Sequence, residues 1–385
     1  MKALKTLISI VALTLCYTIT SGFDIVSKNE AASFENFEKP KKKYIKVALL
    51  LDTSNSMDGL INQAKAKLWD IINELSYARH KGQAPNLEIA LYEYGNDNLS
   101  SQEGYIRQVI GFTNDLDDIS EKLFSLTTNG GSEFCGHVIQ TSLNQLEWGD
   151  NPDDLKLIFI AGNEPFTQGT VDYRNATANA KEKDVVVNTI FCGNHNLGIN
   201  GEWKNGAILT DGDYMSIDHN EEIVQIVTPY DDLILQLNIK LNNTYIPYGN
   251  RGYEKMKIQA TQDANAASVN EEVQLKRTVS KSSGLYKNTT WDLVDAAAEK
   301  DFSYDDLEKK DLPEPLKEKS TYEIKKYVAQ KAGERSNIQK EIQALNAKRK
   351  KYIAEEKKNV TSKGLENAMI KALKSQASKK DYIWQ

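Results

Sequence analysis

Two short, almost uninterrupted apolar runs constrain the fold of this chain more than any other feature. They are residues 44–51 (YIKVALLL) and 155–161 (LKLIFIA). A strand that is apolar on both faces must be covered on both sides, which is typical of the central strands of a parallel sheet. The two runs therefore predict a sheet with helices packed on each face.

Shorter segments continue an alternation of strand and helix patterns up to residue 217. Further strands are expected at residues 87–94, 105–112, 185–191 and 214–217. Helices are expected at residues 60–74, 116–126, 134–148, 170–183 and 203–209. Strands separated by helical crossovers predict an α/β fold with a doubly wound, mostly parallel sheet flanked by helices. Ligands of such folds bind at the carboxyl ends of the strands.

The strand signals stop after residue 245, so residues 44–245 are expected to form the α/β domain and residues 246–385 an α-helical C-terminal region. Residues 320–358 read as one long charged helix, and Ser320 with Glu323 forms a capping-box pattern at its start. Apolar residues recur there at near-heptad spacing: Ile324, Val328, Ile338, Ile342 and Leu345. Three basic residues interrupt this seam: Lys331, Arg335 and Arg349. The pattern fits a coiled coil over 320–358 or an amphipathic helix packed on its own domain.

The N-terminus has the pattern of a secretory signal peptide over residues 1–22. Lys2 and Lys5 precede an apolar stretch at residues 7–16, and small residues follow it. Cys16 invites comparison with a lipid-modified cysteine, but Leu15 before it does not fit that signal. Residues 23–43 are polar and are expected to be a linker. These patterns predict an exported protein.

Removal of the signal peptide would leave two cysteines, Cys135 and Cys192. An even number of cysteines in an exported protein permits one disulfide between them. Two buried free thiols are the alternative.

Charge and hydropathy argue against nucleic acid as a partner and against a transmembrane helix after the signal peptide. The 385 residues carry 48 Lys and Arg against 54 Asp and Glu, a formal net charge of −6. This balance argues against binding of nucleic acid through overall positive charge. No run after the signal peptide reaches the ~20 apolar residues of a transmembrane helix.

The most informative polar residues follow the first apolar run directly. Asp52, Ser54 and Ser56 form a D-x-S-x-S pattern, in which alternate loop residues can point the same way. One carboxylate and two hydroxyls make an all-oxygen ligand set, which suits Mg²⁺ or Mn²⁺. The alternative is that these side chains only cap the following helix.

At this point the chain resembles a von Willebrand factor type A domain, in which D-x-S-x-S begins a metal-ion-dependent adhesion site. The resemblance extends to residues 129–132 (NGGS), where that family has a Gly-Gly-Thr-type loop, and to residues 158–165 (IFIAGNEP), where it has a strand ending in Thr-Asp-Gly. It covers residues 44–245.

The resemblance implies that Asp52, Ser54, Ser56 and Ser132 hold the divalent ion. The chain departs from the family at Gly162, which stands where a second acidic residue is usual. Asn163 and Glu164 follow it and are candidates to reach the ion directly or through water. In this family an acidic group of the partner often completes the metal's coordination.

The spacing of the histidines and cysteines in the sequence predicts no catalytic site. The four histidines have no zinc-ligand spacing, and Cys135 and His137 are two residues apart on an expected helix, so their side chains diverge. We therefore expect a non-enzymatic, exported binding module that binds a protein partner. Its location would be the periplasm or the surface of a Gram-negative bacterium, the taxon resting on resemblance alone. The alternative is a metal-independent scaffold of a cell-envelope assembly that acts through the helical C-terminal region.

Overall fold

The computed structural model describes residues 43–57, 60–217, 226–357 and 365–384. The expected signal peptide (1–22), Cys16 and all but the last residue of the expected linker (23–43) lie outside the described residues, so export and lipidation stay predictions. Within the described ranges, no helix is both long enough and apolar enough to span a membrane.

A six-stranded sheet forms the centre of the fold, in the order β4-β3-β1-β5-β6-β7. The strands are β1 (Tyr44–Asp52), β3 (Asn86–Tyr94), β4 (Ile106–Thr113), β5 (Leu155–Gly162), β6 (Val185–Cys192) and β7 (Tyr214–Ile217). All neighbours are parallel except β3 and the edge strand β4. The predicted doubly wound, mostly parallel sheet is confirmed.

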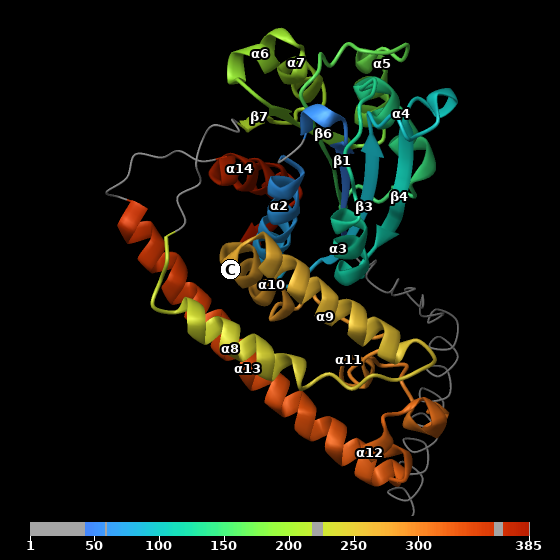
Figure 1. The fold of residues 1–385 in the computed structure, drawn as a ribbon, viewed down its shortest axis with the longest axis vertical. Helices are drawn as coiled ribbons and strands as arrows, with labels where there is room; N and C mark the ends of the chain where they lie inside the picture. The colour runs from blue at the N-terminus through green and yellow to red at the C-terminus, as the bar shows by residue number, and fades with distance from the viewer. Residues whose placement is uncertain (1–42, 58–59, 218–225, 358–364, 385) are drawn as a thin grey trace, which may run out of the picture. The chain divides into compact units, whose positions relative to one another are not determined.

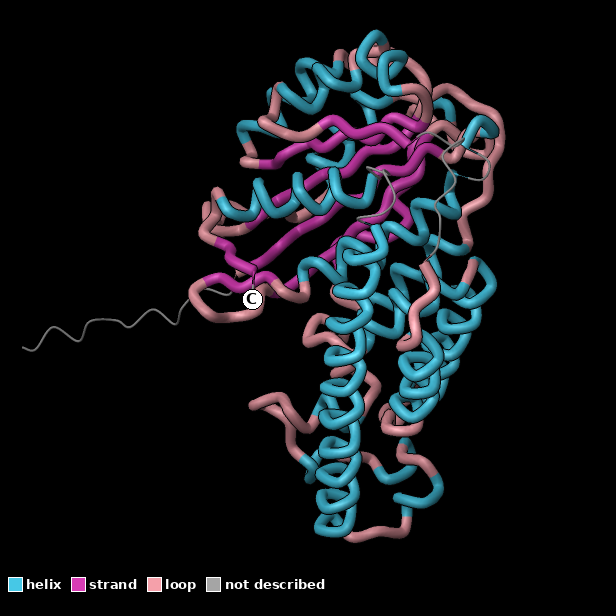
Figure 2. Tube along the Cα trace, turned by 90° about the vertical axis from the view of Figure 1, so that its left-hand side faces the viewer, coloured by secondary structure: helices cyan, strands magenta, loops and turns pink. Residues whose placement is uncertain are grey.

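Alternate residues of β1 enter two separate hydrophobic clusters, one on each face of the sheet. Val47 and Leu49 pack with Trp69 of α2, whereas Ala48 and Leu50 pack with residues of α4 and α5. Figure 1 shows α2 and α14 on one side of the sheet and α4 and α5 on the other, and Figure 2 shows helices along both faces. The helices that belong to the α/β part are α2 (Leu60–Leu75), α3 (Leu116–Phe124), α4 (Cys135–Gln145), α5 (Tyr173–Glu182), α6 (His195–Asn200) and α7 (Trp203–Ile208).

Apart from the short strand β8 (Tyr382–Trp384) near its end, the described chain after β7 is helical; this agrees with the helical region predicted over residues 246–385, which begins earlier in the structure, with α8. It contains α8 (Asp231–Asn242), α9 (Gly252–Val269), α10 (Glu271–Lys281), α11 (Leu293–Ala296), α12 (Glu314–Lys317), α13 (Thr321–Lys357) and α14 (Leu365–Ser378). Helices α10 and α14 pack against α2, and α9 packs against α3. The helical region therefore completes one face of the α/β core.

Helix α13 begins with the predicted capping box: the Glu323 carboxylate accepts the Ser320 N–H at 2.9 Å, and the Glu323 N–H donates to Ser320 Oγ at 3.3 Å. The helix packs along α8, α10 and α11 of its own chain. Ile324 and Val328 are buried in a third hydrophobic cluster, and Ile342 is buried in the cluster beneath the sheet. This is the predicted alternative of an amphipathic helix packed on its own domain.

Two arginines that interrupt the apolar seam of α13 are buried ion-pair anchors. Arg335 donates to Asp292 and Asp295, the latter at 2.7 Å. Arg349 donates to Asp231 at 2.9 Å. Both guanidinium groups thus attach α13 to neighbouring segments of the helical region.

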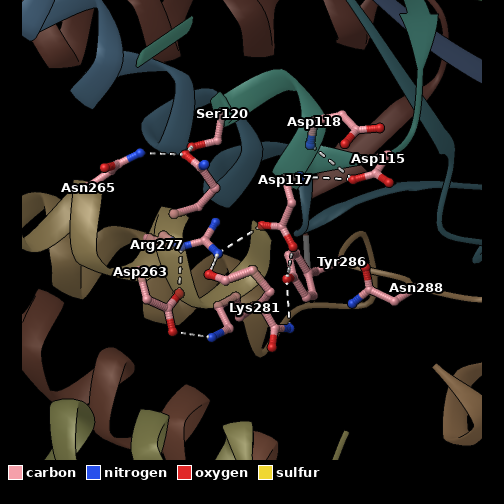
Figure 3. A network of polar contacts seen from close by, with 12 residues as sticks. Asp115, Asp117, Asp118, Ser120, Asp263, Asn265, Arg277, Lys281, Tyr286 and Asn288 are labelled. Atoms are coloured by element: carbon pink, nitrogen blue, oxygen red, sulfur yellow. Dashed lines mark hydrogen bonds and ion pairs between the residues drawn. The ribbon is translucent and has the colours of Figure 1, made fainter. Parts of the chain in front are cut away.

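A larger buried network joins α10 to α3 and α9. Figure 3 shows the Arg277 guanidinium between the carboxylates of Asp117 and Asp263, at 2.8 and 2.7 Å. Lys281 also donates to Asp263, at 2.7 Å, and Tyr286 donates to Asp117, at 2.5 Å. Every charged group in this network has an opposite charge beside it, so we assign it a structural role.

The C-terminal strand β8 (Tyr382–Trp384) pairs antiparallel with β2 (Ala78–His80). Trp384 Nε1 donates to the Glu74 carbonyl at 3.2 Å, and the Tyr382 hydroxyl donates to the Tyr44 carbonyl at 3.4 Å. The end of the described chain therefore lies beside the start of β1.

Of the two alternatives for Cys135 and Cys192, the structure shows buried free thiols and no disulfide. Cys192 ends β6 with its side chain in the cluster that contains Val47, whereas Cys135 opens α4 in the cluster on the other face. The sheet separates the two sulfur atoms. Burial raises the pKa of the Cys135 thiol well above its ordinary value, so it is a poor nucleophile.

Candidate metal site

The predicted ligands lie where the strand order of the sheet reverses. The chain runs from β1 outward to β3 and β4, then returns to β5 on the other side of β1. Asp52 is the last residue of β1 and Gly162 the last residue of β5. This is the topological switch point at which open α/β sheets bind ligands.

Side-chain oxygens join the loops that follow these two strands. The Asp52 carboxylate accepts the Ser54 backbone N–H at 2.7 Å, which folds the loop back over the end of β1. Ser54 Oγ and Ser56 Oγ lie 2.7 Å apart. Ser56 Oγ donates to Asn163 Oδ1 at 3.0 Å. The structure thus brings four of the predicted ligands together.

A second carboxylate, which the sequence analysis missed, lies beside Asp52. Glu133 stands in the loop before α4, and only 3% of it is exposed. Its carboxyl group is within hydrogen-bonding range of Asp52 and Ser54, and it accepts the Glu164 backbone N–H at 3.3 Å. Glu133 therefore bridges the loops after β1 and β5.

The two carboxyl groups are held in an environment that disfavours their negative charge. Burial raises the pKa of Asp52 well above its ordinary value, and the neighbouring Glu133 raises it further. Burial also raises the pKa of Glu133. Among the described residues, Asp52 Oδ2 is buried without a hydrogen-bond donor. Two ionised carboxylates cannot donate to each other, so this pair needs a shared proton or a cation.

Two glycines shape the space around the pair. A Cβ at Gly95, where φ is +76°, would lie 2.7 Å from Glu133 Cγ and 2.8 Å from Asp52 Oδ1. A Cβ at Gly162 would lie 2.5 Å from the Tyr94 hydroxyl. Gly95 therefore makes room for both carboxylates, whereas position 162 has no room for a side chain.

The remaining two predicted ligands have different positions. Ser132 is half-buried and immediately precedes Glu133, so it belongs to the loop that reaches the site. Glu164 contributes backbone contacts: its N–H binds Glu133, and its carbonyl accepts Trp203 Nε1 at 2.7 Å. The signal that could have identified Glu133 was an acidic residue directly after Ser132.

The donor set suits a hard cation that keeps bound water. No group of three or more His, Cys, Asp or Glu side chains that could hold a metal occurs in the described part of the chain. Two carboxylates, serine hydroxyls and an amide oxygen are oxygen donors of the kind that Mg²⁺ and Mn²⁺ accept alongside water. The buried Oδ2 of Asp52, which lacks a donor, fits such an ion.

Comparison with known proteins identifies the family of this part of the chain. Residues 46–198 match the model of the von Willebrand factor type A domain, so the chain contains a domain of this family, as its motifs indicated. Domains of this family mediate protein–protein interactions, often through a metal-ion-dependent adhesion site. No protein of curated function matches the chain.

Solved structures similar to this chain include two with low sequence identity. The conserved hypothetical protein BatB from Bacteroides thetaiotaomicron is 15% identical over 45% of this chain and 90% of its own, with a TM-score of 0.35. Proximal thread matrix protein 1 from the mussel byssus, solved with a zinc-occupied adhesion motif, is 13% identical over 46% of this chain and 42% of its own, with a TM-score of 0.35.

Proposed function

We propose that this protein is an exported, non-enzymatic binding module. Its type A domain would hold Mg²⁺ or Mn²⁺ at the ends of β1 and β5 and bind a protein partner that offers a carboxylate to the ion. Asp52, Ser54, Ser56 and Ser132 are the side chains proposed to surround the cation. Export rests on the N-terminal sequence alone.

One observation carries the metal proposal. Asp52 is fully buried, its Oδ2 has no donor, and a second carboxyl group lies beside it. Burying an ionised carboxylate without a compensating charge is costly. A divalent cation would stabilise both carboxylates at once and provide the missing partner.

The surroundings of the site suit a partner protein. Ser56 is exposed and Asn163 half-buried, so the outer side of the site faces solvent. Mg²⁺ commonly retains several waters, and a carboxylate from a partner can replace one of them. Helix α7 adjoins the site through the contact between Trp203 and Glu164, and α6 packs against α7. They carry Leu197 and Ile208, which are 62% and 55% exposed and offer apolar contact area.

Thermal unfolding of the full chain during titration with MnCl₂ or MgCl₂ tests the proposal. At a free metal concentration of 100 times its Kd, wild type should gain about 2.7 kcal/mol. Asp52→Asn keeps the shape of the side chain and should abolish the gain. Glu182→Gln, an exposed carboxylate on α5, is the control and should keep it.

Two results would contradict metal-dependent binding: no shift in wild type, or an equal shift in wild type and Asp52→Asn. The first would favour the alternative of a metal-independent scaffold that acts through the helical region.

A further inference from the structure

We propose that Glu133 is the second anionic ligand of the cation site and coordinates the same ion as Asp52. This inference rests on the proposed function and deepens it. It assigns to the loop before α4 the negative charge that the end of β5 lacks.

The position of Glu133 supports this role. The loop that carries it is fixed at several points: the Glu133 N–H donates to Gln168 Oε1 at 2.8 Å, and the Gly130 carbonyl accepts the Asp97 N–H at 2.5 Å. The Glu133 carboxyl then reaches Asp52 and Ser54 on one side and the Glu164 N–H on the other. It lies between the two loops that hold the other donors.

The end of β5 cannot supply this charge. The space that a side chain at position 162 would occupy is filled by the Tyr94 hydroxyl at 2.5 Å and by the Trp203 ring at 3.0 Å. Tyr94 is itself fixed there, because its hydroxyl donates to the Ala161 carbonyl at 2.9 Å.

Glu164, the nearest acidic residue after β5, is occupied through its backbone. Its N–H donates to Glu133, and its carbonyl accepts Trp203 Nε1. Its side chain is half-buried, unlike the fully enclosed Glu133. Of the two, Glu133 therefore has the position of a ligand and Glu164 the position of a residue that orients it.

The space for Glu133 depends on Gly95. Any Cβ at position 95 would press on Glu133 Cγ and on Asp52 Oδ1 together. A residue that only filled space would not need to be brought this close to another buried carboxylate, since like charges repel. A cation between or beside them removes that repulsion.

The test is calorimetric titration of the full chain with MnCl₂, using Glu133→Gln and, as the control, Glu182→Gln on the surface of α5. Loss of an orienting residue around a metal typically costs 10–100-fold in affinity, so loss of a direct ligand should weaken Mn²⁺ binding by at least about tenfold. Glu182→Gln should stay within about twofold of wild type, because this exposed carboxylate takes no part in the site. Glu133→Asp keeps the charge but places it farther from the site, because the side chain is one methylene shorter. Its affinity for Mn²⁺ should lie between those of wild type and Glu133→Gln.

Folding and function can be separated in the same experiment. The Gln oxygen can still accept the Glu164 N–H, so Glu133→Gln without metal should keep a wild-type circular dichroism spectrum and unfold no earlier than wild type. Mn²⁺ binding that needs Asp52 but is unchanged in Glu133→Gln would overturn this inference alone. Failure of wild type to bind Mn²⁺ would overturn the proposed function and this inference together.

Discussion

Replacing Arg277 with Met should destabilise the packing of the helical region against the α/β core. The Arg277 side chain is 1% exposed, and its guanidinium donates to Asp117 at 2.8 Å, to Asp263 at 2.7 Å and to the Gln259 carbonyl at 3.1 Å. In Arg277→Met, Asp263 keeps Lys281, but Asp117 keeps only the Tyr286 hydroxyl as a donor from this network.

The expected loss in the free energy of unfolding follows from the carboxylate that stays buried without its partner. Breaking a buried ion pair by removing one partner typically costs 3–5 kcal/mol, because the other charge stays buried without compensation. Met fills part of the same volume, so the loss of packing adds little. We therefore expect Arg277→Met to lower the free energy of unfolding by about 3–5 kcal/mol.

Urea unfolding followed by circular dichroism measures this change, with Arg251→Met as the control. Arg251 pairs with Glu254 at 2.8 Å, but both side chains are more than half exposed, at 60% and 57%. Exposed pairs contribute little, so Arg251→Met should leave the unfolding midpoint unchanged. Equal effects of the two variants would refute the reasoning.

A double-mutant cycle adds a second check. Asp117→Asn removes the charge that Arg277→Met leaves unpaired, so the double variant should be destabilised by less than the sum of the two single changes. Strict additivity would mean that the two groups do not stabilise each other.

Three further outcomes are expected. Burial lowers the pKa of His80 below its ordinary value of 6.5, and the charges of Lys81 and Lys43 lower it further. The stability that neutral His80 provides is therefore complete above pH 6.5 and is lost as the pH falls through the folded-state pKa. In urea titrations, the difference in the free energy of unfolding between wild type and His80→Phe should change between pH 7.5 and 5. Gly162→Ala should lower the free energy of unfolding by about 1–3 kcal/mol, because its methyl group would overpack against Tyr94; unchanged stability would show that Tyr94 moves aside freely. Mass spectrometry after alkylation in denaturant without reductant should find both Cys135 and Cys192 modified, and a Cys135–Cys192 cross-linked peptide would contradict the structure.

The sheet could be predicted because its signals are local. The apolar runs at 44–51 and 155–161 became β1 and β5, and the polar residues that follow them meet at the switch point. Ser54, Ser56 and Asn163 could be predicted because each follows a strand end directly.

Glu133 could not be predicted in the same way. Its role depends on contacts with residues about 30 and 80 positions away, and its place after Ser132 in the sequence does not by itself show those contacts. Arg335 and Arg349 were interpreted as interruptions of an apolar seam because their partners, Asp292 and Asp231, are distant in sequence. The sequence left a disulfide and two buried free thiols open, because an even count says nothing about which face of a sheet each thiol occupies.

The contact between Tyr382 and Tyr44 has a practical consequence. It brings the last described strand to the amino end of β1, whereas Asp52 ends that nine-residue strand, about 26 Å farther along. A fluorophore, surface tether or fusion partner joined beyond residue 384 would therefore start at the edge opposite the carboxylates. Immobilisation beyond residue 384 should leave the proposed ion-binding edge open to soluble ligands.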